Sequence, residues 1–151
     1  MESMKERLVA AIKEIHDNKS ISTMDEASVI SVVVERLLSV LGWNIHDDNE
    51  VKHEHKVGSK AVDFSLRIEG INRVIIEAKR ANENLTPHQR QLLEYSFIAG
   101  VRLATLTNGI EWWFYLPLKE GEWEQRRFYD ADLFRQEPGL IADHFIELLS
   151  K

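Results

Sequence analysis

The run Val74-Ile75-Ile76-Glu77-Ala78-Lys79 most strongly constrains what this chain can fold into. Its apolar start is typical of a strand buried in a sheet. Successive strand side chains point to opposite faces, so Glu77 and Lys79 share one face and Ala78 points to the other. Charged groups beside a core strand are costly unless they are paired or bind a metal ion. The alternative is a strand that leaves the core here, with Glu77 and Lys79 as a solvated pair.

A second carboxylate lies on the preceding strand pattern, Ala61–Ile68, where apolar and polar residues alternate. If the two strands form a hairpin with a three-residue loop at 69–71, Asp63 lies opposite Glu77. A slip of one residue would put the two carboxylates on opposite faces of the sheet. The hairpin therefore decides whether these side chains form one site.

Two adjacent carboxylates and a backbone carbonyl make a set of hard oxygen ligands suited to Mg²⁺ or Mn²⁺. Asp63, Glu77 and the carbonyl of Ala78 are the candidate ligands. A lysine beside such a site can orient an attacking water or help to deprotonate it, because the metal lowers the pKa of that water. Lys79 is the candidate for this role.

The remaining elements are read from hydrophobic periodicity and turn residues. Asn108-Gly109 favours a type I′ turn between two strands, and a Thr23/Glu26 capping box opens the second helix. The sequence predicts helices at 4–18, 23–41, 86–99 and 140–149, and strands at 51–57, 61–68, 74–78, 102–107, 110–116 and 126–129. This order predicts an α/β (α+β-like) fold with a central mixed β-sheet flanked by helices.

Length and composition fit one domain over residues 1–151. We divide it into a helical N-terminus at 1–42, a catalytic core at 43–116 and a C-terminal extension at 117–151. The absence of cysteine excludes disulfides, thiolate metal sites and cysteine nucleophiles. No apolar run is long enough for a membrane span, and the charged N-terminus lacks the apolar region of a signal peptide. A cytoplasmic location is therefore expected.

The formal net charge of -6 argues mildly against a nucleic-acid partner, but the charge is uneven. Residues 1–49 and 111–151 each carry a net charge of -4, whereas residues 50–80 carry +2. The basic residues Lys56, Lys60, Arg80 and Arg90 flank the candidate metal site in sequence. We expect them to contact phosphates, with ordinary surface charge as the competing interpretation.

The pattern Val62-Asp63 followed by Ile76-Glu77-Ala78-Lys79 resembles the core of PD-(D/E)xK nucleases, with Val62 in place of the nominal proline. Gln91 and Tyr95 match the QxxxY element that follows the core lysine in the nuclease domain of type I restriction enzymes. Further segments are similar to small restriction endonucleases related to the N-terminal domain of type I restriction R subunits: 41–44, 58–64 and 106–112. The resemblance extends from about Val34 to Tyr129.

This resemblance implies a restriction-endonuclease-like core and a metal-dependent DNA endonuclease of the restriction type. It implies that Glu35 assists the metal, and that Gln91 and Tyr95 lie by the active site and contact DNA or the metal centre. The competing interpretations are an exposed helix residue for Glu35 and helix–sheet packing for Gln91 and Tyr95.

DNA is the expected substrate. A cutter of duplex DNA usually needs two active sites, so a homodimer or larger homo-oligomer is expected. The chain has no GxxxxGK[ST] motif and therefore no ATP site of this kind, so any motor or specificity subunit would be a separate chain. The alternative function is a catalytically silent DNA-binding or assembly module with the same fold.

Overall fold

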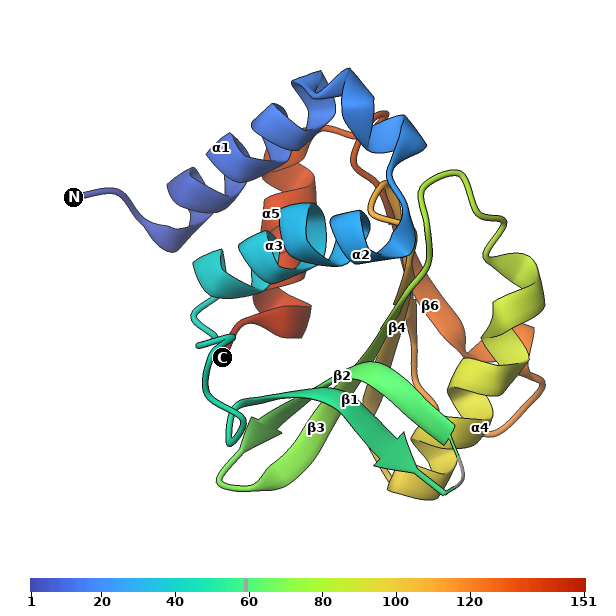
Figure 1. Ribbon diagram of the computed structural model, residues 1–151. Coiled ribbons are helices and arrows are strands. Elements are labelled where there is room, and N and C mark those ends of the chain that lie inside the picture. The colour runs from blue at the N-terminus through green and yellow to red at the C-terminus, as the bar shows by residue number, and fades with distance from the viewer. Residues whose placement is uncertain (59) are drawn as a thin grey trace.

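Six strands form one mixed sheet in the computed structural model, which describes residues 1–58 and 60–151 without the side chains of Val57 and Lys60 (Figure 1). The strands are β1 (Val51–Val57), β2 (Lys60–Ile68), β3 (Ile71–Ala78), β4 (Leu103–Thr107), β5 (Glu111–Tyr115) and β6 (Arg127–Asp132), in that spatial order. Strands β3 and β4 are parallel, and the other neighbouring pairs are antiparallel.

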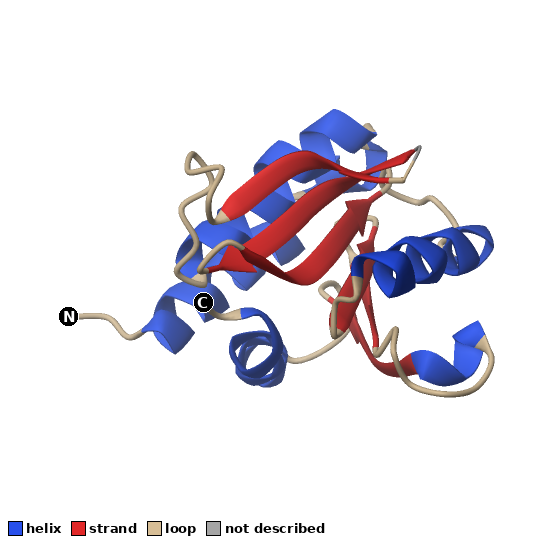
Figure 2. Cartoon of the chain, turned by 90° about the horizontal axis from the view of Figure 1, so that it is seen from below, coloured by secondary structure: helices blue, strands red, loops and turns tan. Residues whose placement is uncertain are grey.

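Helices cover both faces of this sheet (Figures 1 and 2). The α-helices are α1 (Met4–Asp17), α2 (Glu26–Val29), α3 (Glu35–Val40), α4 (Gln89–Ala99) and α5 (Pro138–Leu149). Shorter turns are η1 (Lys19–Thr23), η2 (Ile30–Val34), η3 (Thr86–His88) and η4 (Trp123–Arg126). Helices α1, α3 and α5 pack on one face, and α4 packs on the other. The structure therefore confirms the predicted α/β fold class and the predicted order of elements.

The N-terminal helices follow their apolar stripes. In α1, the predicted residues Leu8, Ala11, Ile12 and Ile15 are buried, and Ser3 caps the helix. The predicted Thr23 cap of the second helix is wrong. The Thr23 hydroxyl donates to the carbonyl of Ser20 in η1, and the side chain of Asp25 caps α2 instead.

Helices α2 and α3 are joined by the π-helical turn η2, which adds one residue to a helical turn. The N–H of Glu35 donates to the carbonyl of Ile30, five residues earlier. Such turns are frequent at functional sites, and they rotate the following helix relative to a continuous α-helix. The face that Glu35 presents is therefore not the one that a regular helix starting at Asp25 would give it.

The β2–β3 hairpin has the predicted register around Asp63, but its turn differs from the predicted one. Its turn contains two residues, Glu69 and Gly70, which both have positive φ, so Ile68 pairs with Ile71. The register then shifts by one residue at a β-bulge, and Phe64 pairs with Ile76. The predicted three-residue loop is wrong, but the bulge supplies the missing residue. The register beyond it is the one that places Asp63 beside Glu77.

The β4–β5 hairpin is confirmed, although its turn differs from the predicted one. The N–H of Asn108 donates to the carbonyl of Glu111, so Gly109 and Ile110 form the turn. The Asn108 side chain accepts hydrogen bonds from the N–H groups of Ile110 and Glu111. Asn108 therefore stabilises the turn through its carboxamide and does not need the positive φ of a type I′ turn.

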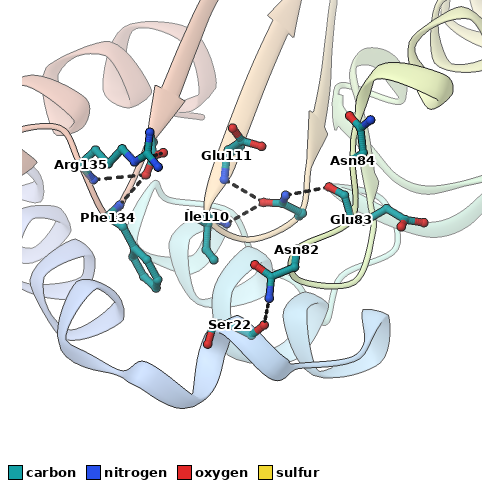
Figure 3. Close-up of a pocket in the computed structure, with 10 residues that line it drawn as sticks. Ser22, Asn82, Glu83, Asn84, Ile110, Glu111, Phe134 and Arg135 are labelled. Carbon is teal, nitrogen blue, oxygen red and sulfur yellow. Dashed lines mark hydrogen bonds and ion pairs between the residues drawn. The ribbon is translucent and has the colours of Figure 1, made fainter.

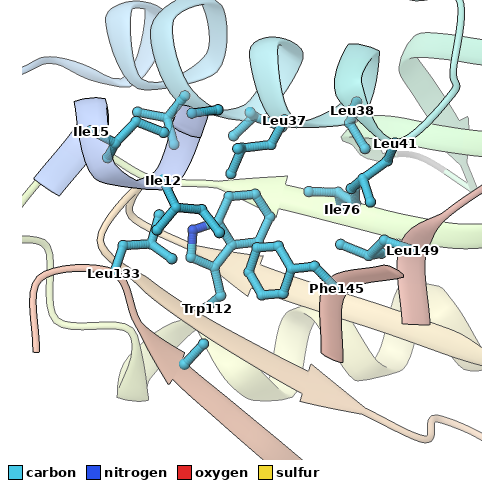
Figure 4. Close-up of a cluster of buried hydrophobic side chains, with 14 of the residues drawn as sticks. Ile12, Ile15, Leu37, Leu38, Leu41, Ile76, Trp112, Leu133, Phe145 and Leu149 are labelled. Atoms are coloured by element: carbon cyan, nitrogen blue, oxygen red, sulfur yellow. The ribbon is translucent and has the colours of Figure 1, made fainter. Parts of the chain in front are cut away.

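The main hydrophobic core lies between the sheet and helices α1, α3 and α5 (Figure 4). Trp112 is fully buried on β5, with its ring centroid 5.2 Å from that of Phe145 on α5. Phe145 also contacts Phe114 edge to face. A second cluster under α4 contains Ile75, Leu92, Leu93, Tyr95, Leu106 and Tyr115. No helix in the described part of the chain has the length and apolar character to cross a membrane.

Phe145→Ala should destabilise the protein by about 3–5 kcal/mol, because it leaves a cavity between α5 and the two β5 aromatics. Phe97→Ala on α4 is the matched control, since Phe97 is 61% exposed and its loss should cost less than about 0.5 kcal/mol. Urea unfolding followed by circular dichroism measures both changes. Equal losses of unfolding free energy in the two variants would contradict this account of the core.

Candidate active site

Asp63 and Glu77 meet at the point where β2 and β3 end their pairing. The N–H of Asp63 donates to Oε1 of Glu77 at 3.2 Å. The N–H of Ala78 donates to Oδ2 of Asp63 at 2.7 Å. Each carboxylate thus accepts a backbone hydrogen bond from the other strand, and the hairpin holds the two acidic groups side by side.

Beyond this pair, β3 continues alongside β4. Glu77 pairs with Leu106 and Ala78 with Thr107, and the N–H of Lys79 donates to the carbonyl of Thr107 at 2.8 Å. Lys79 is therefore fixed by its backbone at the end of the parallel ladder. Its side chain is half-buried.

The Glu77 carboxyl strongly favours its protonated form. Its pKa is raised to about 9, first by burial and then by the hydrogen bond and negative charge of Asp63, against a lowering effect of the Lys79 ammonium. Two half-buried carboxylates this close together disfavour simultaneous ionisation without a compensating cation. At neutral pH this pair therefore holds either a proton or a cation.

A further acidic residue, Glu26, is exposed on the first turn of α2. The pKa of Glu26 is raised, first by burial and then by the charge of Asp63, and it is lowered by Lys79 and His88. The Glu26 carboxylate therefore interacts electrostatically with Asp63 and Lys79. Sequence reasoning missed this residue.

The loop that follows Lys79 brings α2 to the site. The N–H of Ala81 donates to the carbonyl of Met24 at 3.0 Å. Figure 3 shows the Asn82 side chain pointing from this loop to Ser22, whose carbonyl accepts its hydrogen bond. These contacts join segments about sixty residues apart, so no local pattern in the sequence could have revealed Glu26.

The same loop borders a polar pocket of about 420 Å³, drawn in Figure 3. The buried Asn108 carboxamide donates to the carbonyl of Glu83 at 3.1 Å and accepts from the turn of the β4–β5 hairpin. Its hydrogen-bonding groups are thus used in holding the loop against that turn. Asn108 thus fixes the loop that carries Glu83.

A comparison with known protein families matches residues 54–123 to the N terminus of type I restriction enzyme R proteins. The matched segment contains Asp63, Glu77, Lys79, Gln91 and Tyr95. Over this segment the chain is similar to type I restriction R proteins. This match confirms the resemblance drawn from the sequence motifs, although it begins after Val34 and excludes Glu26 and Glu35.

Among solved structures, the type IIG restriction endonuclease BpuSI aligns with 96% of this chain at 16% identity and a TM-score of 0.45. The alignment covers 16% of that enzyme, so the chain spans only a small part of its length. No curated protein sequence matches the chain.

Glu35, outside the segment similar to R proteins, faces His53 on β1. Its Oε2 lies 3.8 Å from Nε2 of His53, and the His53 ring packs against Phe64. His53 and Asp63 both line a shallow pocket of about 230 Å³ between β1, β2 and the π turn. Glu35 thus lies one side chain away from the site, in contact with a residue that borders it.

Gln91 and Tyr95 share one face of α4, as predicted for the QxxxY element of R proteins. The Gln91 carboxamide donates to the Tyr95 hydroxyl, and the Tyr95 ring is buried in the cluster under α4. Within the described residues, no hydrogen bond joins either side chain to Asp63, Glu77 or Lys79. Their proposed contact with substrate stays a prediction.

The four candidate phosphate contacts are dispersed over the molecule. Lys56 is exposed near the end of β1, and the Lys60 side chain lies outside the described residues. Arg80 and Arg90 are exposed, and each faces a glutamate of its own segment, at 3.4 and 3.0 Å. The structure brings none of the described three into hydrogen-bond contact with the carboxylate pair.

The donor set at the site fits a divalent cation only in part. Asp63 and Glu77 offer paired oxygen ligands, which suit Mg²⁺ or Mn²⁺ once both carboxylates are ionised. Residues 1–58 and 60–151 contain no group of three His, Asp or Glu side chains arranged to hold a metal ion. The protein thus supplies two carboxylates, and the Ala78 carbonyl and water would have to complete the coordination.

The raised pKa of Glu77 makes the metal-free protein less stable as the pH rises. Between the unfolded value of 4.5 and the folded value of about 9, the folded chain holds one more proton than the unfolded chain. Stability is therefore present below pH 4.5 and is lost progressively toward pH 9. One extra proton across three pH units corresponds to about 4 kcal/mol. In EDTA, the Tm should therefore fall between pH 5.5 and 8.5 by about 10 °C more in the wild type than in Glu77→Gln.

Differential scanning calorimetry in EDTA measures this difference, with the exposed Glu120→Gln as a charge-matched control. The control should reproduce the pH dependence of the wild type. A Glu77→Gln profile that parallels the wild type would show that the Glu77 carboxyl does not carry the extra proton.

Proposed function

We propose that this chain is a divalent-metal-dependent endodeoxyribonuclease of the restriction type, which hydrolyses phosphodiester bonds in DNA. The observation that supports this proposal most directly is the Asp63–Glu77 pair, fixed by reciprocal backbone hydrogen bonds with Lys79 two residues further on. The similarity of residues 54–123 to type I restriction R proteins supports the same class of reaction.

Asp63, Glu77 and the carbonyl of Ala78 would hold Mg²⁺ or Mn²⁺. When bound, such an ion lowers the pKa of a coordinated water and offsets the negative charge that develops on the phosphate. The proton held by the carboxylate pair leaves as the ion binds, because both carboxylates must be ionised to act as ligands.

Lys79 supplies the positive charge beside this pair. Its ammonium lowers the pKa of both Glu77 and Glu26, so it lies within electrostatic reach of the two groups. From this position it can donate a hydrogen bond to the attacking water or to a phosphate oxygen. Glu26 balances the charge of Lys79 from α2 and can orient a water molecule at the edge of the site.

A catalytically silent DNA-binding or assembly module is the second candidate function. It is favoured by the absence of a third carboxylate grouped with Asp63 and Glu77 in the described part of the chain. In either role we propose DNA as partner, a homodimer or larger homo-oligomer, and a motor or specificity function carried by a separate chain. Cleavage assays separate the two candidates.

Purified wild-type protein should nick supercoiled DNA in Mg²⁺ or Mn²⁺, and EDTA should abolish this activity. Lys79→Ala should reduce the rate at least about 100-fold, because it removes the charge that positions water or phosphate. Asp63→Asn should remove both cleavage and metal binding measured by calorimetry. Cleavage that is unaffected by Lys79→Ala would overturn the assignment, and a wild type that binds DNA without cutting it would favour the silent module.

Glu26→Gln and Glu35→Gln distinguish between the two acidic helix residues. Because Glu26 interacts with Asp63 and Lys79 whereas Glu35 pairs with His53, Glu26→Gln should lower the cleavage rate about tenfold or more. Glu35→Gln should lower the cleavage rate by less than about one third of the factor seen for Glu26→Gln. Initial rates at several Mg²⁺ concentrations measure both variants. The reverse order would restore the role of Glu35 that the family resemblance implies.

A further inference from the structure

Arg67 is a half-buried cation on β2 whose contacts are to neutral groups. Its Nε donates to Oδ1 of Asn72 at 2.8 Å, and its Nη2 lies 3.4 Å from Nδ1 of His55. Across the described residues, no Asp or Glu forms an ion pair with this guanidinium. A guanidinium that is partly removed from water without a counter-charge is costly, unless an external anion completes it.

The hydrogen bonds around Arg67 fix the direction of its guanidinium. Oδ1 of Asn72 also accepts from the hydroxyl of the buried Ser65, at 2.8 Å, so this oxygen is shared by two donors. The Asn72 nitrogen lies 3.4 Å from Nε2 of His55, which closes the network across β1, β2 and β3. A planar guanidinium held in this way is suited to bidentate recognition of a phosphate or carboxylate.

The surroundings of Arg67 carry a positive potential. The pKa of His55 is lowered, first by burial and then by the charges of Arg67 and Lys52. Lys52 pairs with Ser65 across β1 and β2, and Arg73 is exposed in the bulge that directly follows Asn72. Lys52 also pairs with Asp48 at 3.9 Å, whereas neither Arg67 nor Arg73 forms an ion pair with an acidic residue among the described residues.

We propose that Arg67, oriented by Asn72 and His55, binds a phosphate of the DNA backbone at a second position, apart from the Asp63–Glu77 pair. This inference rests on the proposed function, because Arg67 and Asp63 of the candidate site both lie on β2. Four residues of an extended strand separate Arg67 from Asp63, which corresponds to about 13 Å. The phosphates of one DNA strand rise about 3.4 Å per step along the helix axis, so β2 laid along that axis spans about four steps between the two positions. Because Arg67 and Asp63 lie on the same β-strand, a polyanion bound at the proposed nuclease site can also reach Arg67, which favours DNA over an acidic protein segment.

Fluorescence anisotropy with a short duplex in EDTA tests binding without cleavage. Arg67→Gln should weaken binding about fivefold to tenfold and should reduce the slope of log K against log salt by about 1, because one phosphate contact is lost. Arg7→Gln is the matched control, since Arg7 is exposed on α1 and the variant loses the same charge. It should leave both the affinity and the slope unchanged.

Arg67→Lys provides a second variant that keeps the charge but removes the planar fork. It should retain the salt slope of the wild type while its affinity falls about threefold. Circular dichroism confirms that each variant is folded before binding is measured. An absence of DNA binding by the wild type, or equal losses in Arg67→Gln and Arg7→Gln, overturns the proposal.

Two competitors distinguish the source of the anion. Single phosphates, added as inorganic phosphate, should compete only weakly, whereas duplex DNA should compete fully. If polyglutamate binds in an Arg67-dependent manner and DNA does not, the site takes an acidic protein segment and the proposal is wrong. A chain that fails to cut DNA but still binds it through Arg67 would refute the nuclease function alone. A chain that cuts DNA with no dependence of binding on Arg67 would refute the phosphate site alone.

Discussion

The register of the β2–β3 hairpin is the constraint on which the candidate site depends. A two-residue turn at Glu69-Gly70 would by itself leave the strands one residue out of the register that places Asp63 beside Glu77. The bulge after Asn72 corrects this offset. Only beyond it does each carboxylate accept a hydrogen bond from a backbone N–H of the other strand. The irregularity is thus part of the site, because a regular ladder would pair Asp63 with Ile76.

The carboxylate pair sits where the packing of the fold leaves it little water. Strand β3 is flanked by β2 and β4, and its residues Val74–Ile76 are buried, so Glu77 lies at the end of a largely apolar segment. Burial raises the pKa of Glu77, and the adjoining Asp63 adds to that effect. The bonds of Ala81 to Met24 and of Asn82 to Ser22 bring the start of α2 toward the loop that follows β3. At this position the metal-free protein is therefore most stable with Glu77 protonated, whereas cation binding requires Glu77 to be ionised.

The sequence predicted the features that depend on local pattern. The apolar stripe of α1, the hairpin around Gly109 and the alternation of β2 follow from periods of 3.6 and 2 and from turn chemistry. It missed the features that depend on tertiary contacts. Glu26 interacts with Asp63 and Lys79 because Ala81 and Asn82 bond to Met24 and Ser22 before α2. The π turn directs Glu35 toward His53. Bulges and π turns insert one residue without a strong sequence signal. The predicted register of β2 and β3 was correct only because the bulge offset the error in the predicted loop length.

The distribution of charge in the sequence corresponds to layers of the fold. The two acidic segments, 1–49 and 111–151, contain α1, α3 and α5, which pack together on one face, and also β5 and β6. The segment with a net charge of +2 forms β1, β2 and β3. Two of its five acidic residues are Asp63 and Glu77, whose mutual repulsion is relieved by a proton or a cation. The other charges of these strands are mainly positive, and Arg67 keeps its charge unpaired by acids among the described residues. An acidic protein can thus present one sheet segment to a polyanion, because its excess negative charge belongs to other elements.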